Sequence, residues 1–181
     1  MKSSRAFTLI ELLIVSAIIG ILMSLLFPAV NSAIDAARKA QAKNDVTQIA
    51  TAVIAYETEY GRLPTNSAAT VSQTFLQQLD GTTTTGNPRK ITFIEINSAL
   101  DQQGRIKKGK SGTNGTAFVD PWGTPYQIAL DTDYDNTILT AGAGPPWLTT
   151  TSSLRKKVGV WNEPPGNNDS QKKRRAVTSW D

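Results

Sequence analysis

The sequence predicts an α+β protein in which one long N-terminal helix packs on a small antiparallel sheet. Three observations predict this class. An uninterrupted apolar run extends from Phe7 to Val30, an amphipathic helical pattern follows it, and short alternating strands with turn residues come only in the second half of the chain. At 181 residues, the chain has room for one ordinary domain and an extension.

The composition disfavours several classes of function. The chain contains neither cysteine nor histidine, so it lacks thiolate nucleophiles, disulfides, the usual general base near neutral pH and the common zinc ligands. We therefore expect no enzyme. The net charge of +4 comes in basic clusters. Such clusters predict solvated surface, with a contact to anionic lipid as the alternative, and the lack of interleaved aromatic residues predicts no nucleic-acid partner. These clusters lie near the N-terminus, at 105–110, at 155–157 and at 172–175.

The run from Phe7 to Val30 is long enough to cross a bilayer, because as a helix it would span roughly 36 Å. Lys2 and Arg5 precede it and favour a cytoplasmic N-terminus. A secretory signal peptide is the first alternative, but its apolar core is shorter and ends at a small-residue cleavage site. A plain membrane anchor is the second alternative, and it explains every feature of the run except Glu11.

Glu11 is the unusual residue of the apolar run. A carboxylate inside a bilayer costs about 2.5 to 3.5 kcal/mol at the midplane, so such residues are functional by default. One interpretation is that Glu11 reaches the lipid headgroups. The other is that it binds a cation: a cut before Phe7 would create an α-amine four residues away, and a neighbouring subunit could offer its own amine.

The helical pattern continues past the apolar run to about Tyr60, where Gly61 and Pro64 are typical of a helix end. Pro28 is expected to kink or locally unwind this helix, because proline has no N–H donor and clashes with the preceding turn. The apolar positions that recur at mainly three- and four-residue spacings are Ile34, Ala37, Ala42, Val46, Ile49, Ala50, Val53, Ile54 and Tyr60.

The remaining chain predicts short elements joined by loops. A helix is expected over 71–79 and is ended by Gly81, and a long loop is expected over 97–116. The segment 90–96 is strand-like, with an irregular covering segment as the alternative.

A turn and further strands are expected in the second half. Asp120-Pro121-Trp122-Gly123 suits a type I turn. Strands are expected at 126–130 and 157–161, with a return strand over 134–139. Tryptophan side chains at 122, 161 and 180 are expected to fill the core rather than to stack on a ligand.

The segment A-FTLIELLIVSAIIGIL resembles the cleavage and methylation motif of type IV pilins and type II secretion pseudopilins. The resemblance implies that a prepilin peptidase cuts between Ala6 and Phe7 and methylates the new amine, and that Glu11 aligns subunits during assembly. Pro28 lies where this family often carries a kinking proline. Ala6 departs from the usual glycine, but it is small enough for cleavage. The implied organisation is a leader at 1–6, a membrane and assembly helix at 7–30, its amphipathic continuation at 31–62 and a globular domain at 63–181.

The ending Tyr56-x3-Tyr60-Gly-Arg-Leu-Pro, the segment DPWG-x-PY and the terminal Ser179-Trp180 resemble the major pseudopilin branch. The absence of cysteine also favours this branch, because many type IV pilins close their C-terminal region with a disulfide. The resemblance implies a structural subunit of a type II secretion pseudopilus, held in the inner membrane by one span with its C-terminal domain in the periplasm. A type IV or competence pilin is the alternative, and an anchored periplasmic binding protein is a more distant one.

The implied partners follow from that assembly. They are further copies of the chain, the prepilin peptidase, minor pseudopilins, the inner-membrane assembly platform and, before assembly, membrane lipid.

Calcium is the one cofactor that the sequence brings into question. Asp131, Asp133 and Asp135 alternate as in an EF-hand opening, but Asn136 and Gly142 stand where that loop needs glycine and glutamate, so a polar turn is the alternative. The resemblance separately implies a calcium site in the C-terminal loop, where Asp169 is the candidate ligand.

Overall fold

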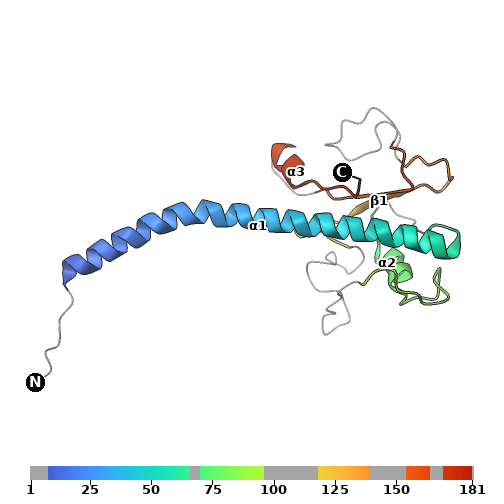
Figure 1. Cartoon of the computed structure of the whole chain (residues 1–181), viewed down its shortest axis with the longest axis horizontal. Coiled ribbons are helices and arrows are strands. Elements are labelled where there is room, and N and C mark those ends of the chain that lie inside the picture. The colour runs from blue at the N-terminus through green and yellow to red at the C-terminus, as the bar shows by residue number, and fades with distance from the viewer. Residues whose placement is uncertain (1–7, 66–69, 96–117, 139–153, 164–168, 181) are drawn as a thin grey trace, which may run out of the picture. The chain divides into compact units, whose positions relative to one another are not determined.

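The computed structural model describes residues 8–65, 70–95, 118–138, 154–163 and 169–180. The chain divides into two compact units, Met1–Ala37 and Arg38–Asp181. The long N-terminal helix and the small antiparallel sheet confirm the α+β class (Figure 1). The predicted loop at 97–116 and the predicted leader at 1–6 lie outside the described residues. The elements are α1 Leu9–Tyr60, α2 Gln73–Asp80, β1 Gln127–Leu130, β2 Val158–Trp161 and α3 Asp169–Arg175.

In the second unit, α1 buries one face against the rest of the domain. The fully buried positions recur at three- and four-residue spacings, as an amphipathic helix requires. The helix ends as predicted at Gly61, which has a φ of 65° and whose N–H donates to the carbonyl of Glu57 at 2.8 Å. The buried residues of this face are Ala42, Val46, Ile49, Ala52, Val53 and Tyr56.

Helix α2 is fixed at both ends by its own sequence. The Ser72 hydroxyl accepts a hydrogen bond from the N–H of Phe75 at 3.2 Å, which caps the first turn. Gly81 ends the helix with a φ of 77°, and a Cβ there would lie 2.8 Å from the Lys90 carbonyl oxygen. The expected helix is thus confirmed, although its first turn begins at Gln73.

Strands β1 and β2 form a two-stranded antiparallel sheet with Gln127 opposite Trp161 and Leu130 opposite Val158. Isolated bridges extend the pairing, since Thr70 pairs with Gln127 and Thr178 pairs with Trp161. The predicted return strand over 134–139 is wrong across its described part, because β2 pairs with β1 and residues 132–136 bend away instead.

The strand-like segment at 90–96 forms no strand over its described residues, which end at Glu95. The Asn87 side chain binds this segment instead: its Nδ2 donates to the Ile91 carbonyl at 2.7 Å, and its Oδ1 accepts the Ile91 N–H at 3.0 Å. The N–H groups of Phe93 and Ile94 both donate to the Leu79 carbonyl. These contacts hold the chain over the end of α2, so the expected alternative, an irregular covering segment, is confirmed.

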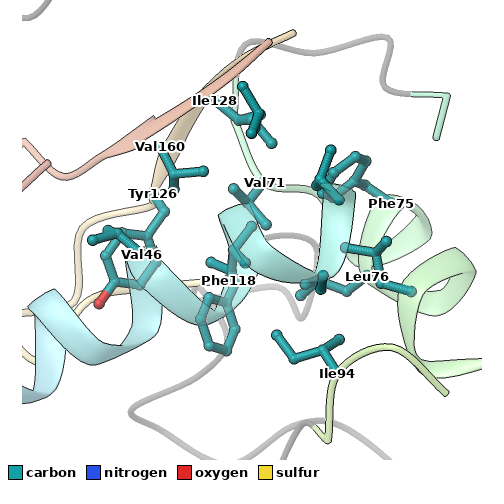
Figure 2. Packing of buried hydrophobic residues seen from close by; sticks show 14 of the residues in the cluster. Val46, Val71, Phe75, Leu76, Ile94, Phe118, Tyr126, Ile128 and Val160 are labelled. Atoms are coloured by element: carbon teal, nitrogen blue, oxygen red, sulfur yellow. The ribbon is translucent and has the colours of Figure 1, made fainter. Parts of the chain in front are cut away.

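The core lies where α1, α2 and the sheet meet. Figure 2 shows side chains from each of these elements converging, with Phe75 and Leu76 from α2 and Ile128 and Val160 from the sheet. Trp161 is buried and packs edge-on against Trp180 at 6.0 Å between ring centroids. A tryptophan that fills space in this way agrees with the expected core role.

Tyr126 is fully buried and contacts α1 (Figure 2). Its hydroxyl donates to Asp45 Oδ2 at 3.1 Å. Burial raises the pKa of Tyr126 well above the usual 10.0, and the Asp45 carboxylate raises it further.

We therefore expect the free energy of unfolding to fall as pH rises above about 10, because tyrosine ionises near that pH in the unfolded chain but not in the fold. Tyr126→Phe should flatten this fall by about 1.4 kcal/mol per pH unit. Urea unfolding of the full chain in detergent at a series of pH values measures the slope. Tyr134→Phe, at an exposed position, should keep the original slope. Equal slopes in all three proteins would contradict the assigned role of Tyr126.

Candidate functional site

The first unit presents an apolar helix that nothing in the described chain covers. From Leu9 to Phe27 every side chain of α1 is exposed, including Leu9 at 88% and Phe27 at 76%. Among the described helices, α1 alone is long and apolar enough to cross a membrane. An apolar surface of this size is unfavourable in water, so this half of α1 requires lipid or other protein around it.

Glu11 lies in the first turn of α1 and is bound to Thr8. Its Oε2 accepts two hydrogen bonds from Thr8, from the backbone N–H at 2.9 Å and from the hydroxyl at 2.8 Å. The Thr8 hydroxyl accepts the Glu11 N–H in return at 3.3 Å. This reciprocal pair is a capping box, which satisfies donors at the helix start that have no partner within the helix.

Thr8 is a site residue that the sequence reasoning missed. The signal was present, because a threonine followed three residues later by glutamate before an apolar run is typical of a capping box. Within the described residues Glu11 pairs with no cation, and Ala6 and Phe7, the predicted cleavage residues, lie outside them. Both hydrogen bonds from Thr8 end on Oε2. The carboxylate is therefore held at the helix start through its Oε2.

The helical conformation of α1 continues through Pro28, so the local unwinding that was one expected effect of this proline is not seen. A kink at Pro28 stays a prediction.

The loop after β1 brings three predicted calcium ligands together. Carboxylate oxygens of Asp131, Asp133 and Asp135 lie within 4.8 Å of one another. Asp131 is buried, and its two oxygens accept the N–H groups of Asp135 at 3.1 Å and Asn136 at 2.9 Å. Oxygen donors of this kind suit calcium, but the same hydrogen bonds also explain the turn without an ion.

Asp169 begins helix α3, which the sequence reasoning missed. The Asp169 side chain lies outside what the structure describes, so its distance to other ligands is not defined. The end of α3 is joined to the rest of the domain by Asn162, which is fully buried. Asn162 Nδ2 donates to Asp120 Oδ2 at 3.0 Å, and its Oδ1 accepts the Val177 N–H at 2.9 Å.

Asp120 organises the turn that the sequence predicts. It is fully buried, and its Oδ1 accepts the N–H groups of Trp122 at 3.0 Å and Thr124 at 2.8 Å. The Gly123 N–H donates to the Asp120 carbonyl at 2.9 Å, which closes the four-residue turn. Together with Asn162, this carboxylate links the turn to the C-terminal segment.

Comparison with known proteins agrees with the exposed helix and its first-turn carboxylate. Residues 1–27 match the family model described as the prokaryotic N-terminal methylation motif. Over 126 residues the chain is 34% identical to the type II secretion system core protein G of Pseudomonas aeruginosa. The matched region covers 70% of this chain and 73% of that protein. No solved structure matches the chain significantly. The chain therefore belongs to the family of type II secretion core protein G, the major pseudopilins.

Proposed function

We propose that the chain is a structural subunit of a type II secretion pseudopilus. The observation that carries this proposal is the uncovered apolar half of α1 with one carboxylate in its first turn. In the membrane, lipid covers this surface, and in a filament, the helices of neighbouring copies cover it instead. Because lipid and helix interiors are similarly apolar, packing and the charge on Glu11 supply the preference for the filament.

Processing supplies the charge that Glu11 needs. The prepilin peptidase would cut between Ala6 and Phe7 and methylate the new amine, which stays cationic after methylation. A copy that is displaced along the filament axis would place this amine against Glu11 of its neighbour. The capping box supports this role, since it fixes the orientation of the carboxylate before the partner arrives.

The proposed location is the inner membrane, with one span and the C-terminal domain in the periplasm. Minor pseudopilins and the assembly platform would be the partners that start the filament and extract subunits from lipid. The chain would have no enzymatic activity of its own.

Deleting the gene separates secretion from the alternative of a type IV or competence pilin. We expect folded export substrates to accumulate in the periplasm, and surface fibres and DNA uptake to remain. Loss of surface fibres or DNA uptake with unchanged export would contradict the secretion proposal.

We further propose that the loop of Asp131, Asp133 and Asp135 holds calcium, because its clustered carboxylates fit a hard cation. A ligand at a hundred times its dissociation constant stabilises a fold by about 2.7 kcal/mol. Calcium should therefore raise the midpoint of thermal unfolding of the full chain, and a chelator should reverse the rise. Asp133→Asn should remove the effect and Asp169→Asn should leave it. The opposite result would place the ion in the C-terminal loop, and no calcium effect would contradict both sites.

A further inference from the structure

Two segments that are far apart in the sequence bring basic side chains to one end of the second unit. Helix α1 enters the unit there, and α3 lies at the same end (Figure 1). The contact that fixes this placement is the hydrogen bond from Lys43 Nζ to the Thr178 carbonyl at 2.9 Å, just after α3. We name this group the basic collar; it consists of Arg38, Lys39 and Lys43 of α1 and Lys172, Lys173, Arg174 and Arg175 of α3.

Two of these residues are partly buried and hold the collar together, and the other five are exposed. Lys43 and Arg175 are half-buried, and the Arg175 guanidinium lies 5.7 Å from the centre of the Trp122 ring. The exposed members are Arg38, Lys39, Lys172, Lys173 and Arg174. The collar is therefore a fixed surface with outward-facing cations.

Helix stability alone does not account for the collar. Basic residues in the last turn favour a helix through its dipole, but that effect is weak and confined to the turn. In α3 the four consecutive basic residues repel one another, and Arg38 and Lys39 lie on a different helix.

The position of the collar along the chain indicates its partner. Arg38 follows the end of the predicted membrane span at Val30 by about eight residues, which rise roughly 12 Å along a helix. The headgroup layer occupies roughly 5 to 7 Å beyond the hydrocarbon core, and charges act over about 8 Å at physiological ionic strength. The first collar residues therefore lie within electrostatic reach of the headgroups.

We propose that the basic collar binds the phosphate groups of anionic lipids at the periplasmic surface of the inner membrane while the subunit is still anchored. The inference rests on the proposed membrane stage of the function. Each lysine or arginine near an anionic bilayer strengthens binding about fivefold. A subunit that enters the filament would release these lipids as it leaves the membrane.

Energy transfer from tryptophan to a headgroup label tests the proposal in the full chain, because all tryptophans lie in the second unit. The chain is reconstituted into vesicles of phosphatidylcholine, with or without phosphatidylglycerol, that carry a dansyl-labelled headgroup. We expect phosphatidylglycerol to increase the transfer and salt to reverse the increase. The double variant Lys172→Glu/Lys173→Glu should weaken the contact at least about 25-fold and remove the increase.

The matched control is Arg155→Glu/Lys156→Glu, which makes the same charge change at exposed residues near the other end of the unit, where Lys156 borders a hollow with Glu57 and Gly61. This variant should keep the increase. The proposed lipid contact of the collar is wrong if phosphatidylglycerol does not change the energy transfer, or if both variants lose the increase in transfer equally. Unchanged lipid contact with lost filament assembly in Lys172→Glu/Lys173→Glu also overturns it and favours a neighbouring copy as partner. Flotation of the vesicles shows whether the chain is inserted. A chain that floats with neither kind of vesicle contradicts both the membrane-anchored subunit and the lipid contact of the collar. A chain that floats with both kinds but shows no increase in energy transfer contradicts only the lipid contact of the collar.

Discussion

Glu11→Gln is expected to abolish filament assembly while leaving the chain anchored in the membrane. Glutamine at this position can still reach back to Thr8, so the substitution removes the charge and keeps the capping box. The amine of a neighbouring copy would then be buried without a partner. A single unpaired charge at membrane depth costs about 2.5 to 3.5 kcal/mol, which weakens each subunit contact roughly 100-fold.

The measurement is the amount of protein in sheared filaments compared with the membrane fraction. Thr8→Ser is the matched control, because serine keeps the capping hydroxyl and the charge on Glu11 is untouched. This variant should assemble normally. Normal filaments from Glu11→Gln would show that Glu11 serves only to cap the helix, and that its charge is not needed for filament assembly.

Asp120→Ala should produce a large loss of stability in the globular unit. The fully buried carboxylate accepts hydrogen bonds from the Trp122 and Thr124 backbone and from the Asn162 side chain. Alanine would leave these donors without an acceptor, and each unsatisfied buried group costs about 1 to 3 kcal/mol. We expect a decrease of about 3 to 5 kcal/mol in the free energy of unfolding.

Urea unfolding of the full chain in detergent, followed by tryptophan fluorescence, measures this decrease. Asp133→Ala in the presence of a chelator is the control, because Asp133 is exposed and the same substitution there should change stability by less than about 0.5 kcal/mol. Similar small losses in both variants would contradict the role given to Asp120.

The sequence predicted those elements whose local signals agree with the tertiary contacts. The apolar run and the spacing of Val46, Ile49 and Val53 defined α1, and the turn at Asp120-Pro121-Trp122-Gly123 formed as expected. In each case the residues that form the element also form its stabilising contacts. An element can be predicted from sequence when the local conformational preference of its residues agrees with their packing in the fold.

The strand predicted at 90–96 does not form over its described residues, because the segment pairs with the side chain of Asn87 and not with another strand. The alternating apolar residues are typical of a strand at the edge of a sheet. In the fold, the Asn87 amide makes the hydrogen bonds to the Ile91 backbone that a neighbouring strand would otherwise make. Helix α3 was missed for the opposite reason: it has no apolar period, and tertiary contacts such as Arg175 over Trp122 hold it. Neither contact leaves a pattern in the neighbouring sequence.

The candidate site was predicted in part. Glu11 stood out because a carboxylate in an apolar run is costly, whereas its hydrogen bonds to Thr8 require knowledge of where the helix begins. The grouping of Arg38, Lys39 and Lys43 with the basic residues of α3 depends on the fold of a segment more than a hundred residues away, as the Lys43–Thr178 contact shows. A sequence pattern cannot reveal such a long-range grouping.

We expect that a processed form of this chain polymerises, and the intact mass of subunits in isolated filaments tests this expectation. The chain is expressed with a prepilin peptidase and the assembly machinery, and filaments are sheared from the cells. The subunits should begin at Phe7 and carry one added methyl group. Filaments built of uncut chain, or a correctly cut and methylated chain that forms no filaments, would contradict this expectation.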